Sequence, residues 1–157
     1  MSHQTPATPD TVALPRLRRL LEYWQTQCRG RAMPGRADID PMDFPWLLGN
    51  VSLADVVPDG GGGYRYHMRL VGTRVVERFG YDPTGKWLDE LPERDYRIRV
   101  QATFDDVVRQ RRPMTEKLHM LIDDRMHDYL VLRLPLSKDG GQVDMLMIAA
   151  EFFDPNV

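Results

Sequence analysis

The sequence contains a single cysteine, Cys28. The chain therefore cannot form an internal disulfide or a metal site with several thiolate ligands. It also lacks the run of about 18 apolar residues that a membrane-spanning helix needs, because the apolar stretch Met145–Ala150 is long enough only for a buried strand. The opening residues Met1–Asp10 are polar and lack the apolar centre of a secretory signal. We therefore expect a soluble, cytoplasmic protein.

The net charge gives no reason to expect a polyanionic partner. The chain carries 21 lysine and arginine residues against 23 aspartate and glutamate residues, for a net charge of −2 and an isoelectric point near 6.1. Arginines are dense between Arg94 and Arg112, but acidic residues such as Asp105 are interspersed among them. We interpret this stretch as a solvated helix face and predict neither nucleic acid nor membrane as a partner.

Motifs for common catalytic chemistry are also missing. The sequence has no G-x-S-x-G nucleophile turn, no G-x-x-x-x-G-K-[ST] phosphate loop and no H-E-x-x-H metal motif. The acidic pairs Asp105–Asp106 and Asp123–Asp124 consist of sequence neighbours, whose side chains diverge on a helix or a strand. We therefore predict a protein that is not an enzyme, with no catalytic residue and no metal ligand.

At 157 residues, 42% of them hydrophobic, the chain is long enough for one domain with its own core. Residues 1–13 are predicted to form a disordered tail, 14–36 an amphipathic helix with its linker, and 37–157 the main domain. Pro15 suits the first turn of that helix, which we expect to end near Arg29. One stripe of the helix is apolar, because residues of this kind recur at spacings of three and four: Leu14, Leu17, Leu21, Trp24 and Cys28.

The rest of the chain alternates between strand and helix patterns. Predicted helices cover 42–48, 73–79 and 94–112, and predicted strands cover 51–57, 64–71, 115–123, 129–136 and 142–153. Leucines at alternate positions from Leu130 to Leu136 give the fourth strand one strongly apolar face. The order predicts an α+β fold with a five-stranded antiparallel sheet, helices on one face, and the additional N-terminal helix.

Several motifs in this order resemble those of a known family. The segment Phe79–Lys86 resembles the glycine-tyrosine loop that follows the short helices of PAS domains. More narrowly, the chain resembles a proteobacterial single-domain PAS family with four ordered features. These are Trp24 in the N-terminal helix, the D-I-D-P segment Asp38–Pro41, the R-L-V-G-T box Arg69–Thr73, and the late strand Tyr129–Ser137. The resemblance implies the PAS fold and a role in signal transduction.

The resemblance leaves the ligand open, because PAS domains bind haem, flavins, small acids, lipids or nothing. A photoactive flavin of the light-sensing type needs a reactive cysteine in the helical middle of the fold, and Cys28 precedes that region. Haem needs an axial ligand, and His67, His119 and His127 fall on predicted strands or turns rather than on the long helix. Both cofactors are therefore disfavoured, and the cofactor stays unassigned.

Arg69 and Thr73 are the predicted polar anchors of a ligand pocket. A guanidinium and the start of a helix could together hold a carboxylate or a similar anion. In the alternative interpretation, Arg69 pairs with a neighbouring carboxylate and Thr73 caps the helix. The predicted pocket between sheet and helices has an apolar lining, for which the candidates are Phe104, Val108, Leu118, Leu132 and Leu134.

The apolar stripe of the N-terminal helix needs a cover, either its own sheet or a second subunit. PAS domains often dimerise through such a helix, so the resemblance implies a homodimer. The predicted interface consists of Leu14, Leu17, Leu21 and Trp24.

The leading functional hypothesis is a stand-alone PAS sensory module that binds a small ligand or a protein partner and signals through dimerisation. A second hypothesis is a ligand-free adaptor for protein partners, whose pocket would be packed shut. The residues predicted to fill it are Phe79, Met68, Met120 and Met147. A third is a small α+β enzyme, which would need an isolated buried acid or a Tyr/Asp pair in the cavity.

Overall fold

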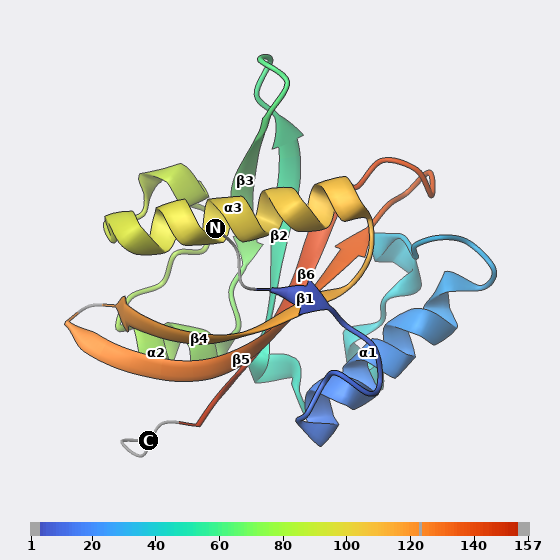
Figure 1. Ribbon diagram of the computed structural model, residues 1–157, viewed down its shortest axis with the longest axis horizontal. Helices are drawn as coiled ribbons and strands as arrows, with labels where there is room; N and C mark the ends of the chain where they lie inside the picture. Colours follow the sequence, from blue (N-terminus) through green and yellow to red (C-terminus); the bar gives the residue numbers. More distant parts are fainter. Residues whose placement is uncertain (1–3, 123, 154–157) are drawn as a thin grey trace.

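The computed structural model describes residues 4–122 and 124–153. Its centre is an antiparallel sheet with the strand order β1-β4-β5-β6-β2-β3 (Figure 1). The strands are β1 (Thr5–Pro6), β2 (Val51–Pro58), β3 (Tyr64–Leu70), β4 (Met114–Ile122), β5 (Arg125–Leu136) and β6 (Met145–Phe152). The sheet thus has six strands where the sequence predicted five, and the additional one is the short β1.

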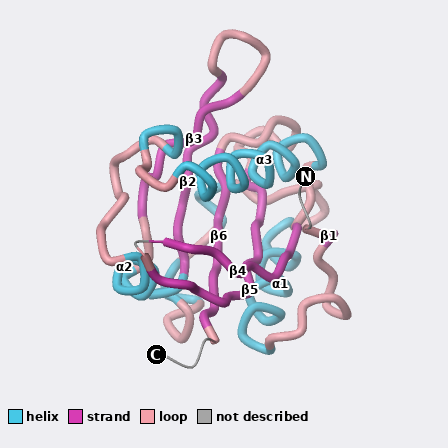
Figure 2. The backbone as a smooth tube through the Cα atoms, turned by 60° about the vertical axis from the view of Figure 1, so that its left-hand side comes forward, coloured by secondary structure: helices cyan, strands magenta, loops and turns pink. Residues whose placement is uncertain are grey.

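The described residues also form three α-helices and four 3₁₀ turns. The helices are α1 (Pro15–Cys28), α2 (Thr73–Phe79) and α3 (Arg94–Gln110), and the 3₁₀ turns are η1 (Arg36–Asp38), η2 (Pro41–Asp43), η3 (Leu48–Asn50) and η4 (Leu88–Glu90). The loop between β2 and β3 projects beyond the body of the domain (Figure 2). None of the helices in the described ranges is both long and apolar enough to cross a membrane.

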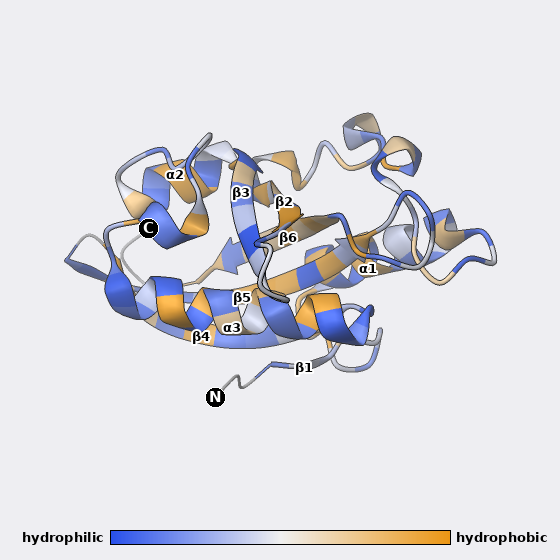
Figure 3. Ribbon diagram, turned by 90° about the horizontal axis from the view of Figure 1, so that it is seen from above, coloured by the Kyte–Doolittle hydropathy of each residue, from blue (hydrophilic) through white to orange (hydrophobic). Residues whose placement is uncertain are grey.

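Both faces of β5 are buried from Val131 to Leu136, and they face different neighbours. Tyr129, Val131 and Arg133 point to the face that α3 covers, which we call the inner face. Leu132 and Leu134 alternate with them and therefore point to the opposite, outer face. Helix α1 packs against β5 on this outer side. Blue hydrophilic and orange hydrophobic residues alternate along α3, which lies next to β4 and β5 (Figure 3).

The apolar stripe of α1 is covered by the chain's own sheet. Leu17 and Leu21 are completely buried, and Trp24 is nearly so. The indole Nε1 of Trp24 donates a hydrogen bond of 2.9 Å to the carbonyl oxygen of Pro135. Leu14 is partly buried against the same core. Burial of this stripe within one chain leaves it little free apolar surface, so the structure offers no support for the predicted dimer interface through these four residues.

Residues 4–13 do not form the disordered tail that the sequence predicted, and residues 1–3 of that tail lie outside the described residues. Thr5 and Pro6 pair with Thr115 and Met114 at the edge of β4. Val12 is completely buried. The prediction failed because such a polar, proline-containing stretch shows no periodicity, whereas the exposed edge of β4 supplies backbone partners that no local pattern reveals.

The predicted helix over 42–48 is replaced by the separate 3₁₀ turns η2 and η3. Asp40 caps the first of these as expected, accepting a 3.0 Å hydrogen bond from the backbone N–H of Met42. Pro45 interrupts the segment because it lacks an N–H group and disfavours helical dihedrals at the preceding residue, Phe44. The predicted third strand also reached Asp123, which lies outside the described residues.

Candidate functional site

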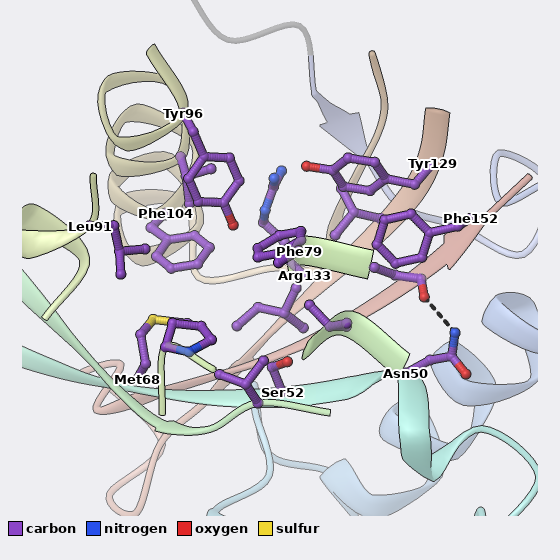
Figure 4. Close-up of a pocket in the computed structure, with 17 residues that line it drawn as sticks. Asn50, Ser52, Met68, Phe79, Leu91, Tyr96, Phe104, Tyr129, Arg133 and Phe152 are labelled. Atoms are coloured by element: carbon purple, nitrogen blue, oxygen red, sulfur yellow. Dashed lines mark hydrogen bonds between the residues drawn. The ribbon is translucent and has the colours of Figure 1, made fainter. Parts of the chain in front are cut away.

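A small cavity lies between the inner face of the sheet and the helices (Figure 4). Its volume is about 50 Å³. Most of its wall is apolar or aromatic, including Met68 from β3, Phe79 from α2 and Phe104 from α3. The remaining lining residues are Asn50, Ser52, Val71, Val75, Pro83, Leu91, Tyr96, Val100, Tyr129, Val131, Arg133, Ile148, Ala150 and Phe152.

The volume limits what the cavity holds without rearrangement. A buried water needs roughly 10–15 Å³ of such space, and an engineered cavity of about 150 Å³ holds benzene. The present cavity therefore has room for a few waters or a compact molecule of a few heavy atoms. A larger ligand would require side chains such as Phe79 or Met68 to move.

The polar end of the cavity is built around Arg133, on β5. Its side chain is only 2% exposed, and Nη1 donates a 2.6 Å hydrogen bond to Oε1 of Glu116, on the neighbouring strand β4. Nε of Arg133 is buried and has no hydrogen-bond partner among the described residues. A buried, unsatisfied guanidinium N–H is costly. Nε is out of contact with solvent, so an acceptor in the cavity reaches it only when the guanidinium or a neighbouring side chain moves.

A second arginine, Arg99, gives the surroundings of Arg133 and Glu116 an excess of positive charge. The other oxygen of Glu116, Oε2, lies 3.3 Å from Nη2 of Arg99, on α3. One carboxylate with a 1% exposed side chain is therefore shared by two guanidinium groups. Within this triad the formal charge is +1, in a region where the low dielectric makes an unbalanced charge important.

Two tyrosine side chains flank the guanidinium of Arg133. Figure 4 shows it between Tyr96, from α3, and Tyr129, from β5. Burial raises the pKa of Tyr96 to about 12 and that of Tyr129 well above its usual value, although Arg133 acts in the opposite direction on both. Neither hydroxyl makes a hydrogen bond with another described residue. Both therefore stay protonated near neutral pH and can donate to a ligand.

The polar end of the cavity is also connected to the N-terminal segment. Oε1 of Gln4 accepts a 2.9 Å hydrogen bond from Nη1 of Arg133. Nε2 of Gln4 donates to the carbonyl oxygen of Thr103, at 2.8 Å, and to Oδ2 of Asp106, at 3.1 Å. One side chain thus joins the residue before β1 to α3 and to the cavity arginine.

The opposite end of the cavity depends on a close backbone approach. Gly72 precedes α2, and its N–H donates to Oγ of Ser52 at 3.2 Å. A Cβ atom at Gly72 would lie 2.4 Å from the carbonyl oxygen of Gly49. Its φ of −59° is ordinary, so this glycine is required for space rather than for its dihedral angles. Gly85, with a φ of +85°, is by contrast one of the glycines required for a left-handed backbone conformation.

Phe104 is the one predicted ligand residue that lines this cavity. Val108 and Leu118 are buried but are not among its lining residues, while Leu132 and Leu134 point to the outer face. Nε of Arg69 lies 2.9 Å from Oδ1 of Asp55, as in the alternative interpretation.

Thr73 is exposed in the first turn of α2, where Gly72 occupies the cap position. The predicted anchors Arg69 and Thr73 are therefore not brought together with Phe104.

Sequence reasoning missed Tyr96, Tyr129 and Arg133 as site residues. Arg133 carried a usable signal, because it interrupts the apolar run 130–136 of β5, which is buried on both faces from Val131 onward. A charge at such a position requires a buried partner. Tyr129 and Arg133 also share one face of the strand, which identifies them as neighbours once the strand is assigned.

The histidines considered as haem ligands do not line the cavity. His67 and His119 pair with Asp55 and Asp128 on the sheet surface. His127 is buried beside Phe79 and Phe152, with ring centroids 6.4 and 6.1 Å away. Within residues 4–122 and 124–153, no group of three or more histidine, cysteine or acidic side chains is arranged to hold a metal ion.

Comparisons with known proteins agree on one family and fold. A family model described as a PAS domain matches residues 12–148. The structure is similar to that of the PAS domain of BvgS from Bordetella pertussis, with a TM-score of 0.53, 15% identity, and coverage of 75% of this chain and 90% of that one. No curated protein matches the chain.

A second similar structure is that of the LOV protein of Rhodobacter sphaeroides. The TM-score is 0.51 and the identity 16%, with coverage of 68% of this chain and 61% of that one. The chain thus spans less than two thirds of that structure. At these identities the two likenesses establish the fold and leave the ligand open.

Proposed function

The chain belongs to the PAS domain family, and on that premise we propose that it senses a small molecule bound in the cavity between α3 and the inner face of the sheet. PAS domains are in general sensory rather than catalytic modules. The observation that carries the proposal is the polar end of the cavity, where the buried Arg133 has an unsatisfied N–H group and a direct hydrogen bond to Gln4. The site therefore combines a recognition group with a connection to a distant segment.

The proposed signal is a shift in the population of two arrangements of the N-terminal segment. A ligand that draws the Arg133 guanidinium toward the cavity weakens its bond to Gln4. Gln4 also holds α3, and β1 follows it directly at the edge of β4. The ligand therefore favours the arrangement in which β1 is detached, by an amount equal to its differential affinity for the two states.

Detachment of β1 would also provide an output. The edge of β4 would then present unpaired backbone groups, which can pair with a strand from a protein partner or from a second copy of the chain. We place the dimerisation predicted from the sequence at this edge, since the apolar stripe of α1 is covered in cis.

A ligand-free adaptor is the second candidate, favoured by the small volume of the cavity. Of the four residues predicted to close it, Phe79 and Met68 do contribute to its wall, whereas Met120 and Met147 do not. An enzyme would need a buried acid, and no acidic side chain is among the lining residues. The pair Tyr66 and Asp105, with a 2.6 Å hydrogen bond, joins β3 to α3 outside the lining.

Filling the cavity distinguishes the sensor from the adaptor. Ala150 lies on β6 in the cavity wall, so Ala150→Val places two additional methyl groups in the space for a ligand. We expect native mass spectrometry of gently isolated protein to show a bound small molecule in the wild type and none in Ala150→Val. Thermal unfolding should show that the free variant is folded and about as stable as the free wild type, because the methyl groups enter an existing void.

Ala102→Val is the matched control, since it makes the same change on the exposed side of α3. This variant should retain the bound molecule. A wild-type protein that neither carries a small molecule nor binds one on titration, or an Ala150→Val variant that carries the same amount as the wild type, would overturn the sensor in favour of the adaptor.

A further inference from the structure

We infer that the molecule sensed in the cavity is a compact carboxylate, held by the guanidinium of Arg133 and the hydroxyls of Tyr96 and Tyr129. This inference rests on the proposed function and specifies the chemical class of its ligand. It follows from three properties of the cavity: the donors at its polar end, the charge of that end, and its size.

The polar end of the cavity has more hydrogen-bond donors than acceptors. Arg133 has an unsatisfied Nε–H, and a guanidinium offers no acceptor. The two tyrosine hydroxyls beside it are protonated, because burial raises the pKa of both. A ligand that satisfies all three must accept several hydrogen bonds at one end. A carboxylate does so with two oxygens and about four lone-pair positions, whereas an amine or ammonium group offers only donors in its charged form.

The charge of the site favours an anion over a neutral acceptor. Glu116 is the one carboxylate bonded to Arg133 in the described ranges, and Arg99 shares it. Glu93 also acts on Tyr96, but its Oε2 accepts a 2.8 Å hydrogen bond from the hydroxyl of Tyr81. A ligand carboxylate would bring the triad of Arg133, Arg99 and Glu116 from +1 to neutrality, and charge-assisted hydrogen bonds to a guanidinium are the stronger kind.

The size of the cavity restricts the rest of the ligand. About 50 Å³ suits a short aliphatic acid, and it is a third of the roughly 150 Å³ cavity that holds benzene. The wall next to the polar end is apolar, formed by side chains such as Val100, Phe104 and Ile148. A carboxylate with a short, unbranched carbon chain therefore matches both ends of the space.

Propionate, propionamide and propylamine test the inference, because they have nearly the same size and differ in the group that meets Arg133. We expect titrations monitored by NMR chemical shifts to show saturable binding of propionate. The affinities for propionamide and propylamine should be lower by about ten-fold or more. Benzoate should bind more weakly than propionate. Ala150→Val should abolish the binding of propionate.

Tyr96→Phe and Tyr129→Phe test the site without removing the buried charge of Arg133, so both variants are expected to fold. Each should weaken the binding of propionate by about ten-fold, since each removes one hydrogen bond to a charged group. Tyr23→Phe is the matched control, because its hydroxyl bonds to Asp43 on the other side of the molecule and its loss should leave binding unchanged.

Equal binding of propionate and propionamide, or unchanged binding of propionate in both cavity tyrosine variants, would overturn the inference. If native mass spectrometry then identifies a neutral or cationic molecule that Ala150→Val displaces, the sensor stands and only the carboxylate assignment falls. If neither the probes nor any copurified molecule binds, the proposed function falls together with it.

Discussion

Glu116→Gln should lower the free energy of unfolding by about 3–5 kcal/mol, the usual cost of leaving one partner of a buried ion pair uncompensated. The glutamine preserves the shape of the side chain and one acceptor oxygen, so packing changes little. It removes the charge that balances Arg133, whose side chain is 2% exposed, and that also lies 3.3 Å from Nη2 of Arg99. Urea denaturation of both proteins measures the difference.

A double variant separates charge from packing. Arg133→Met combined with Glu116→Leu replaces the buried pair by apolar groups, and we expect it to recover most of the stability lost in Glu116→Gln. Asp89→Asn is the surface control, because Asp89 and Arg65 form an exposed pair that should contribute at most about 1 kcal/mol. Equal losses in Glu116→Gln and Asp89→Asn would contradict the buried triad.

Gly72→Ala should be the most damaging glycine substitution, with a loss of about 3 kcal/mol or more. The new methyl group would lie 2.4 Å from the carbonyl oxygen of Gly49 and 2.9 Å from that of Val51, both of them backbone atoms. Relief requires the start of α2 to move away from β2, which also displaces the cavity wall at Val71 and Val75. Thermal and urea denaturation measure the loss.

Substitutions at two other glycines separate the cost of a steric clash from the cost of a strained backbone dihedral angle. Gly85→Ala meets no atom within 4 Å but keeps a φ of +85°, so it should cost roughly 1–2 kcal/mol from backbone strain. Gly61→Ala lies in the exposed β2–β3 loop with no contact closer than 3.6 Å, and its effect should stay within about 0.5 kcal/mol. If the Gly72→Ala protein is as stable as the Gly61→Ala protein, the close approach of Gly72 to the Gly49 backbone is contradicted.

The sequence predicted most helices and strands because their signals are local. Pro15 marks the start of α1, and α2 was predicted over the residues that form it. The failures have identifiable causes. Pro45 divides the segment predicted as a helix over 42–48, and β1 depends on the edge of a strand more than a hundred residues away.

The site was harder to predict because the apolar pattern of β5 does not show which of its two buried faces borders the cavity. Leu132 and Leu134 have the more apolar side chains, yet they pack on the outer face. Val131 and Arg133 face the cavity instead. A strand segment buried on both sides is apolar on both sides, so its composition does not show which face borders the cavity. Arg69 became a candidate anchor for another reason: it lies at the end of a strand, next to the helix that begins at Thr73, whereas Arg133 lies within a strand.

The central claim is that a ligand in the cavity is reported to the N-terminal segment through Arg133 and Gln4. Amide hydrogen exchange tests it most directly, because the N–H of Ala7 donates a 2.9 Å hydrogen bond to the carbonyl oxygen of Pro113 and thereby reports the docking of the segment that contains β1. With saturating propionate, we predict faster exchange at Ala7 in the wild type and unchanged exchange in Ala150→Val. Exchange at Ala7 that is the same with and without bound propionate would contradict the claim.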